Sequence, residues 1–467
     1  MLKASLSATS QLAKFSMNAT GFPELARKRA IDAITDCAAC MLAGARQPLA
    51  GAVARAIPTF EHRTGAASAA LVGAARYASP LDAALFNGAV AHALDYDDTN
   101  HPAYAHPSAV IAPVLMAVAA TEPVTGSDLI SAYIVGLEVF GKLGRVLNRG
   151  HYKRGWHATA TFGTLAASMV AGRLLRLDQR AMEMAIGIAA SSAGGLRVNF
   201  GSMVKPLHSG YAARNGLLAA LLAREGLESS IDTLDHRYGY FALFANEGEI
   251  DPQPFQHLGE SLEILSEYGL ALKPYPSCGA THPGIEAAIA LHEQLRGQTI
   301  RSVRAGVCEM AFEPLIYVGP HDSLQGKFSM HYCLAVGLLD GKVNLDSFTM
   351  RRISDPAIID LIPKIVMETD ERIRHDGEFA TILTVVTEDG RVHERFVPLA
   401  MGKPARWLSR EQLKAKFDDC LGESKSSASR DAVFDSLQSL DREEAAAAMF
   451  EILYESRFST EANTASK

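Results

Sequence analysis

Apolar residues recur every three or four positions from the start of the chain to about residue 266, which is the spacing of one helix face. The pattern is clear in "RKRAIDAITDCAACMLAGA", "SDLISAYIVGLEVFGKLGRVL", "TFGTLAASMVAGRLL" and "NGLLAALLAREG". Several of these segments are apolar on most faces and rich in alanine and glycine, which is typical of helices buried on all sides. No period of 20–50 residues recurs, which argues against a solenoid. The pattern predicts a multi-layer all-helical domain over residues 1–267.

The pattern changes after "SEYGLALKPYPSCGATHPG". One helical segment follows, then "IRSVRAGVCEMAFEPL" alternates as a strand does, and "FATILTVVTEDGRVHERFVPLA" predicts a hairpin that turns at Asp389-Gly390. We therefore expect a smaller α+β domain over residues 268–403. Residues 404–460 return to helical spacing and are expected to pack back on the first domain, and residues 461–467 to be a disordered tail. The predicted fold class is mainly α: a large all-helical domain with an inserted smaller α+β domain.

Composition is that of a globular protein, with 467 residues, 48% hydrophobic and 21% charged. The length allows two or three domains. The net charge of −7 and the lack of a basic cluster argue against a nucleic-acid partner. Six cysteines are too few for a disulfide scaffold in a chain this long, and we expect Cys37 and Cys40 to be buried structural thiols.

Two segments bear on location. The first 21 residues lack the continuous apolar run of a secretory signal. Residues 155–172, "GWHATATFGTLAASMVAG", approach the length of a membrane span, but they hold His157 and many small residues and are flanked by basic residues. We expect a buried helix there, no membrane partner, and a protein of the reducing cytoplasm.

A stretch crowded with titratable groups, "HALDYDDTNHPAYAHPS" (residues 92–108), precedes an apolar helical segment. Ser108 is a candidate N-cap for that helix, which would hold the loop near a positive helix end. Three interpretations stay open for the stretch: a divalent-metal site, an acid/base site and a hydrogen-bonded structural loop. The residues concerned are Asp95, Asp97, Asp98, Thr99, His101 and His106.

Four further stretches place polar side chains in apolar surroundings. They are "KRGWHATATFG" with His157, "RVNFGSMVKPLHSGYAARNG" with Lys205, "LKPYPSCGATHPGIEAA" with Lys273 and His282, and "GKFSMHYCLAVGLL" with Tyr332. Three of them have an ordinary interpretation as well: a satisfied core histidine for His157, a solvated loop lysine for Lys205 and a packed tyrosine for Tyr332. The third of these stretches lies at the predicted domain boundary, where ligand clefts are common.

Taken together, the five stretches resemble the MmgE/PrpD family in order and spacing, over nearly the whole chain. Between His101 and His106 this chain reads "PAYA", one residue longer than the form in the decarboxylase of the family, and Tyr211 stands where many relatives have a basic residue. The family's active-site positions fall, by motif, on Asp95, Thr99, His106, His157, Lys205, Lys273 and Tyr332.

The resemblance implies a helical domain with an α+β lid, a homodimer, and a small polycarboxylate as substrate, with neither a metal nor a cofactor. Known members include 2-methylcitrate dehydratase, cis-aconitate decarboxylase and iminodisuccinate epimerase. Each makes or consumes a carbanion-like centre beside a carboxylate, which calls for cations and a proton-transferring group. We expect the following roles: Lys205, Lys273, His282 and Thr99 bind substrate, His106 and His157 transfer protons, Asp95 orients a histidine, and Tyr332 donates to the leaving hydroxyl.

Dehydration is the first expectation because it is the commonest family activity, and the same groups would serve decarboxylation or epimerisation. A non-catalytic polycarboxylate-binding protein is a more distant alternative. A metal-dependent lyase is a third, which rests on the aspartate and histidine cluster of residues 95–106 and predicts activity lost to chelators.

Overall fold

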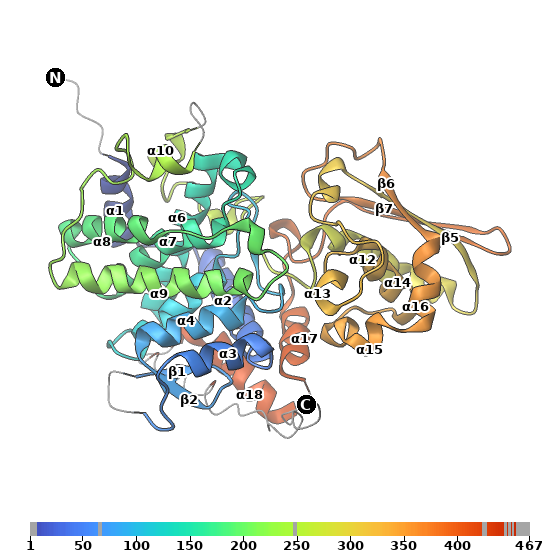
Figure 1. The fold of residues 1–467 in the computed structure, drawn as a ribbon, viewed down its shortest axis with the longest axis horizontal. Helices are drawn as coiled ribbons and strands as arrows, with labels where there is room; N and C mark the ends of the chain where they lie inside the picture. The colour runs from blue at the N-terminus through green and yellow to red at the C-terminus, as the bar shows by residue number, and fades with distance from the viewer. Residues whose placement is uncertain are drawn as a thin grey trace. The chain divides into compact units, whose positions relative to one another are not determined.

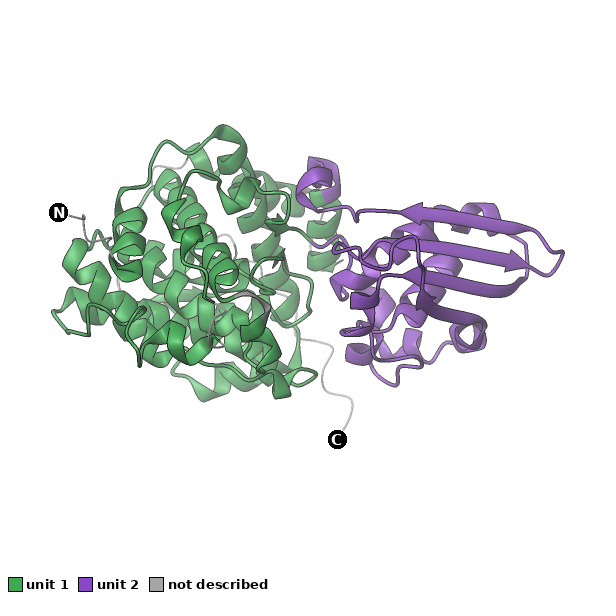
Figure 2. Ribbon diagram, turned by 90° about the horizontal axis from the view of Figure 1, so that it is seen from above, with its two compact units in different colours: residues 1–272, 413–467 green, residues 273–412 purple. Residues whose placement is uncertain are grey.

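A computed structural model describes residues 7–63, 68–245, 250–422 and 427–442, together with Ala446, Phe450 and Leu453. These residues are mostly helical, as predicted, with small sheets (Figure 1). The chain divides into two compact units, residues 1–272 with 413–467 and residues 273–412 (Figure 2). The boundaries expected from the sequence, after residues 267 and 403, differ from these. The predicted tail, residues 461–467, lies outside the described residues.

The first unit is built from helices of very different lengths. They are α1 (Ala8–Asn18), α2 (Glu24–Gly44), α3 (Pro48–Ala56), α4 (Pro80–Ala91), α5 (Ser108–Ala119), α6 (Gly126–Lys153), α7 (Ala158–Leu174), α8 (Gln179–Ser192), α9 (Val204–Arg224), α10 (Tyr240–Phe244), α11 (Gln253–Gln256), α17 (Arg410–Leu421, mostly in this unit) and α18 (Ser427–Gln438).

Helix α7 is the central helix of this unit and comes from the stretch that nearly matches a membrane span. It packs against α5 and, as Figure 1 shows, lies beside α6, α8 and α9. All its residues except Arg173 are buried. Small side chains allow this close packing: a Cβ on Gly216 of α9 would lie 2.3 Å from the Ala167 Cβ of α7. No helix among the described residues is both long and apolar enough to cross a membrane.

Helices α4 and α9 approach each other through glycines. A Cβ on Gly210 would lie 2.2 Å from the Leu85 carbonyl oxygen, and one on Gly88 would lie 2.8 Å from the Gly210 Cα. The clash would be with backbone, which cannot move aside without moving a helix. The two glycines therefore set the distance between the end of α4 and the start of α9, where site residues lie.

Short strands complete the first unit. β1 (Ala69–Leu71) pairs with β2 (Arg76–Ala78), and β3 (Thr99–Asn100) pairs with β4 (Leu270–Ala271), both antiparallel. In the second pair Thr99 is opposite Ala271, so a segment 172 positions further along the chain holds the loop that follows α4.

The second unit has a four-stranded sheet in the order β6-β5-β7-β8. The strands are β5 (Ile300–Val307), β6 (Ile365–Thr369), β7 (Thr381–Thr387) and β8 (Val392–Val397); β5 and β6 are parallel and the other pairs antiparallel. The predicted hairpin is confirmed as β7–β8, with Gly390 at φ 85° in its turn. The helices are α12 (His282–His292), α13 (Ser323–Gly326), α14 (Met330–Asp340), α15 (Met350–Ile353) and α16 (Pro356–Leu361), of which α12 and α14 contact the sheet.

Candidate active site

The loop between α4 and α5 carries most of the polar groups that the sequence singled out. Its backbone turns sharply at Asp95, which has a φ of 53° in the left-handed region. Aspartate tolerates that conformation better than most residues, yet it is strained for any side chain with a Cβ. The side chains of Asp95, Asp97 and Asp98 are all buried. Strained, buried carboxylates on a loop are typical of functional sites.

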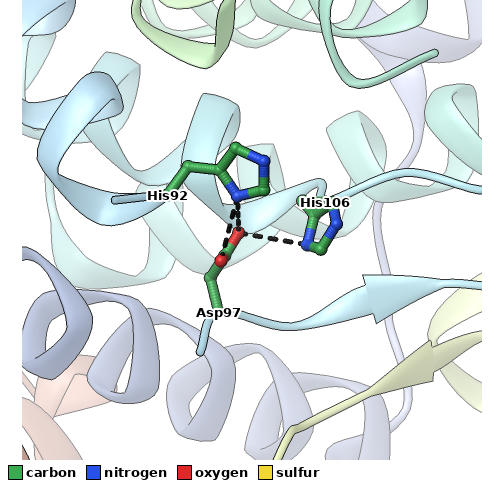
Figure 3. A group of neighbouring side chains, drawn as sticks. All are labelled: His92, Asp97 and His106. Carbon is green, nitrogen blue, oxygen red and sulfur yellow. Dashed lines mark hydrogen bonds and ion pairs between the residues drawn. The ribbon is translucent and has the colours of Figure 1, made fainter. Parts of the chain in front are cut away.

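Asp97 lies between two histidines (Figure 3). Its carboxylate oxygens are 2.9 and 3.0 Å from the Nδ1 atom of His92, and its Oδ2 is 3.3 Å from the Nδ1 atom of His106. The His106 Nδ1 is also 2.9 Å from the Asp98 carbonyl oxygen. Because these oxygens only accept, each Nδ1 donates a hydrogen bond. In the neutral histidines, Nε2 is therefore the basic atom.

Burial and the ion pairs settle the charges in this group. Burial opposes a charge on Asp97, but the neighbouring His92 and His106 outweigh it and hold the pKa of Asp97 well below its usual range. Burial lowers the pKa of His92 to about 4. At neutral pH, Asp97 is thus an ionised acceptor and His92 a neutral donor. The His92 Nε2 is buried without a hydrogen-bond partner among the described residues.

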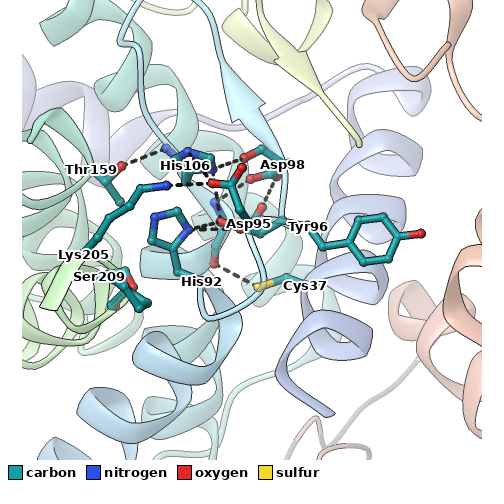
Figure 4. Close-up of polar contacts among 12 residues, drawn as sticks. Cys37, His92, Asp95, Tyr96, Asp98, His106, Thr159, Lys205 and Ser209 are labelled. Carbon is teal, nitrogen blue, oxygen red and sulfur yellow. Dashed lines mark hydrogen bonds and ion pairs between the residues drawn. The ribbon is translucent and has the colours of Figure 1, made fainter. Parts of the chain in front are cut away.

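Lys205 pairs with Asp95 at the first turn of α9 (Figure 4). The distance from the lysine Nζ to the Asp95 Oδ1 is 2.7 Å, and the same oxygen lies 4.0 Å from the Nε2 of His106. The basic nitrogen of His106 therefore faces a lysine–carboxylate pair. The sequence assigned Asp95 to orient a histidine, whereas the close carboxylate at the His106 ring is that of Asp97.

His157 closes the cluster from the start of α7. Its backbone N–H donates to the Gly195 carbonyl oxygen at 2.9 Å, and its Nδ1 is 3.0 Å from the Nδ1 of His208 on α9. Only one of these two nitrogens can carry the shared proton. Burial, together with the nearby positive charge of Lys205, keeps the pKa of His157 well below its usual value. His157 is therefore neutral at physiological pH.

Asp98 anchors the end of the loop. Burial raises its pKa to about 7. Its carboxylate accepts hydrogen bonds from the hydroxyl of Ser108 and, at 3.1 Å, from the Ser108 N–H. Ser108 is thus the first residue of α5 rather than its N-cap as predicted, and Asp98 satisfies the helix end instead. The backbone N–H of His106 donates to the Thr159 hydroxyl at 3.1 Å, which ties the loop to α7.

A cavity of about 340 Å³ in the first unit adjoins the histidines. Its lining is mixed: polar side chains such as Ser192, Asn199 and Tyr211 alternate with small or apolar residues such as Leu196, and it includes His208 but no lysine, arginine or carboxylate. Since His208 lines the cavity and also contacts His157, the cavity reaches the cluster through that pair.

The structure brings together Asp95, His106, His157 and Lys205 of the predicted site, and it places Thr99 nearby in β3. Lys273, His282 and Tyr332 belong to the second unit. The His282 Nε2 lies 3.2 Å from the Ser277 carbonyl oxygen, and the buried Tyr332 hydroxyl donates to the Ser347 carbonyl oxygen. This contact fits the packing interpretation of Tyr332; its predicted role as a donor to substrate stays a prediction.

Three members of the cluster were not predicted: His92, Asp97 as the shared carboxylate, and His208. All three lie inside stretches that the sequence marked, so their residue type and neighbourhood were available signals. The metal interpretation has a counterpart in the structure, since ligand atoms of His92, Asp97 and His106 lie within 4.8 Å of one another. Here the two Nδ1 atoms point at Asp97 as donors, which favours a hydrogen-bonded group. His101 packs its ring against Tyr104 instead.

The chain is similar to known proteins over most of its length. The family model of the MmgE/PrpD N-terminal domain matches residues 10–253, and that of the MmgE/PrpD C-terminal domain matches residues 275–440. Cis-aconitate decarboxylase of Mus musculus is 30% identical over 351 residues, which are 72% of this chain and 71% of the relative. The Aspergillus terreus enzyme of that name is 30% identical over 376 residues, 75% of each chain, and the Homo sapiens one 29% over 360 residues, 72% of each.

Proposed function

This chain belongs to the MmgE/PrpD family, and from that premise we propose that it is a lyase acting on a small polycarboxylate, with decarboxylation of cis-aconitate as the first candidate. The relatives named above are cis-aconitate decarboxylases, which supports this reaction over the dehydration that the sequence placed first. The observation that carries the proposal is the His106 Nε2 beside the Lys205–Asp95 pair, with Nδ1 held by Asp97.

Lys205 is the proposed carboxylate ligand. An ammonium group in buried surroundings attracts a carboxylate far more strongly than one in water does. In the free protein that charge is matched by Asp95 at 2.7 Å. We expect a substrate carboxylate to take up the lysine and to release Asp95 from the ion pair, close to the His106 Nε2.

His106 is the proposed proton donor. Decarboxylation breaks the bond between a carboxylate carbon and the carbon skeleton, releases CO₂, leaves the electron pair on the skeleton, and ends when a skeleton carbon accepts a proton. His106 can present that proton on Nε2 because its Nδ1–H is held by Asp97 and by the Asp98 carbonyl. His157 is less suited to donate, since burial keeps it neutral. We assign it, with His208, to hydrogen bonding at the wall of the site.

Lys273 and His282 are proposed as further carboxylate ligands, on the family resemblance alone. A Lys273→Met substitution should raise the KM for substrate, because a cation is lost.

The family also supports a homodimer, which sedimentation velocity would test.

The experiment is conversion of a substrate panel in D₂O followed by proton NMR, with purified, chelator-treated protein. We expect cis-aconitate to give itaconate with deuterium on the newly protonated carbon. A new vinylic signal from 2-methylcitrate or citrate, with cis-aconitate unchanged, would instead establish dehydration. Exchange and inversion at the α-carbon of iminodisuccinate would establish epimerisation. Activity seen only after a divalent ion is restored would favour the metal-dependent alternative.

A further inference from the structure

Tyr96, the residue between Asp95 and Asp97, is held by the C-terminal helix α17. The Nζ of Lys416 donates to the Tyr96 carbonyl oxygen at 2.7 Å and lies 4.3 Å from the centre of the Tyr96 ring. One turn further along α17, Asp419 accepts the Tyr96 hydroxyl at 3.4 Å. The peptide that joins the two site aspartates is therefore fixed by a segment 320 positions away in the chain.

Lys416 is an unusual lysine because only 4% of its surface is exposed. Its Nζ also pairs with Asp36 of α2 at 2.6 Å, and Asp36 is 1% exposed. A buried ion pair by itself adds little stability over an apolar pair of the same size. Two apolar side chains would therefore hold α17 against α2 equally well. The bond from Nζ to the Tyr96 carbonyl is the part that only a donor can make.

The loop needs such a hold because Asp95 is strained. A residue with a Cβ at φ 53° stays there only when its neighbours over-determine its position. Lys205 holds the Asp95 side chain, and Lys416 holds the carbonyl of the next residue. Two lysines from two helices thus fix the turn that points Asp95 at Lys205 and Asp97 at the two histidines.

We propose that Lys416 is a positioning residue of the active site: its hydrogen bond to the Tyr96 carbonyl keeps Asp95 and Asp97 in register with Lys205, His92 and His106. Lys416 acts through the loop backbone and does not touch substrate. The inference rests on the proposed function only for its activity readout.

The test breaks the same ion pair from either end. Lys416→Met removes the donor to Tyr96, whereas Asp36→Asn leaves that donor in place. At a temperature where circular dichroism shows every variant folded, we expect Lys416→Met to lose tenfold or more in kcat with KM changed less than threefold. Asp36→Asn should keep kcat within threefold of wild type. Lys414→Met is the control, since Lys414 lies on the same helix but pairs with Asp418 and Asp431 outside the core.

Equal losses of kcat in Lys416→Met and Asp36→Asn would overturn the proposal, because they would reduce Lys416 to a stabilising ion pair. Wild-type kcat in folded Lys416→Met would overturn it too. If the single variant does not fold, the double variant Asp36→Leu/Lys416→Met removes both buried charges and is expected to fold with the same tenfold loss. Wild-type kcat in that double variant would overturn the proposal.

A structural readout separates this inference from the proposed function. If wild-type protein converts nothing in the substrate panel, the proposed function fails, and the crystal structure of the double variant still tests Lys416. We expect the Asp95 carboxylate to have moved beyond hydrogen-bond distance of Lys205. An unchanged loop would overturn the inference.

Discussion

At the scale of single residues, the main feature of the cluster is one carboxylate that two histidines share as their hydrogen-bond acceptor. One carboxylate, Asp97, accepts from two histidine rings whose centres are 4.3 Å apart. A shared acceptor fixes both rings in the same sense, with Nδ1 protonated and Nε2 turned away from the carboxylate. Solvent cannot orient the His92 ring in this way, since the His92 and Asp97 side chains have no exposed surface.

Replacing Asp97 with asparagine tests this orientation. An amide offers one acceptor and one donor in place of two acceptors, so one histidine must change its tautomer or lose its bond. Where a carboxylate behind a catalytic histidine is replaced by an amide, kcat falls by a factor on the order of 10⁴. We expect a loss of about 10²–10⁴ in kcat for Asp97→Asn with the fold retained. Asp389→Asn at the exposed hairpin turn is the control, and undiminished turnover by Asp97→Asn would refute the role.

A second residue-scale prediction concerns stability and pH. His151 is buried, and burial lowers its pKa from 6.5 to about 4. Between these values the unfolded chain binds a proton that the folded protein does not. The stability tied to a neutral His151 is therefore complete above pH 6.5 and declines as the pH falls towards 4. Urea unfolding of His151→Gln should show a smaller stability difference between pH 7 and pH 5 than wild type. The exposed His257→Gln should match wild type, and an unchanged difference in His151→Gln would contradict the prediction.

At the scale of elements, the site depends on how closely two helices approach. Helix α4 ends just before His92, and α9 carries Lys205 and His208. Their distance is set by Gly88 and Gly210, which place backbone against backbone. Any added side chain there must push α9, and with it Lys205, away from Asp95.

Gly210→Ala tests this dependence. Its new methyl group would lie 2.2 Å from the Leu85 carbonyl oxygen, so we expect a loss of about 1–3 kcal/mol in the free energy of unfolding. We also expect kcat to fall at temperatures where the variant is folded. Gly51→Ala in α3 is the control, because its methyl group would meet only the flexible end of Arg55. Full stability and activity in Gly210→Ala would show that α9 does not need this approach.

The elements themselves were largely predictable, and the reasons are local. Helical spacing identified the buried α7, and an Asp-Gly turn between alternating strands identified β7–β8. The different partners of Asp95, Asp97 and Asp98 could not be predicted, because they depend on the φ of Asp95 and on residues far along the chain. The sequence holds one faint signal for Lys416: it lies three residues after Leu413 and four before Cys420, on the apolar face of α17.

At the scale of the whole molecule, the chain holds two units with separate cores. The core of residues 273–412 joins α12, α14 and the sheet, with Ile285, Met330, Leu334, Val303 and Leu383 fully or almost fully buried. A core of this kind should support a domain by itself.

We expect the fragment 273–412 to fold alone and to unfold cooperatively by circular dichroism. A chain that ends at residue 412 should lose the fold of its first unit, because Asp36 would stay buried without Lys416 and α2 would lose its partner α18. Limited proteolysis should then degrade residues 1–272 and spare the second unit. Protease resistance of residues 1–272 in that shortened chain would contradict the prediction.

The first unit is formed by two separate segments of the chain, and the second unit lies between them in the sequence. During synthesis, the histidines of the cluster leave the ribosome first, residues 273–412 follow, and Lys416 emerges only after them. Domains fold as they leave the ribosome, so the inserted unit can finish first while the helical unit waits for its last part. The hydrogen bond from Lys416 to the site loop therefore forms last. A chain that ends early because its ribosome stalls would carry all four histidines of the cluster but lack this hydrogen bond.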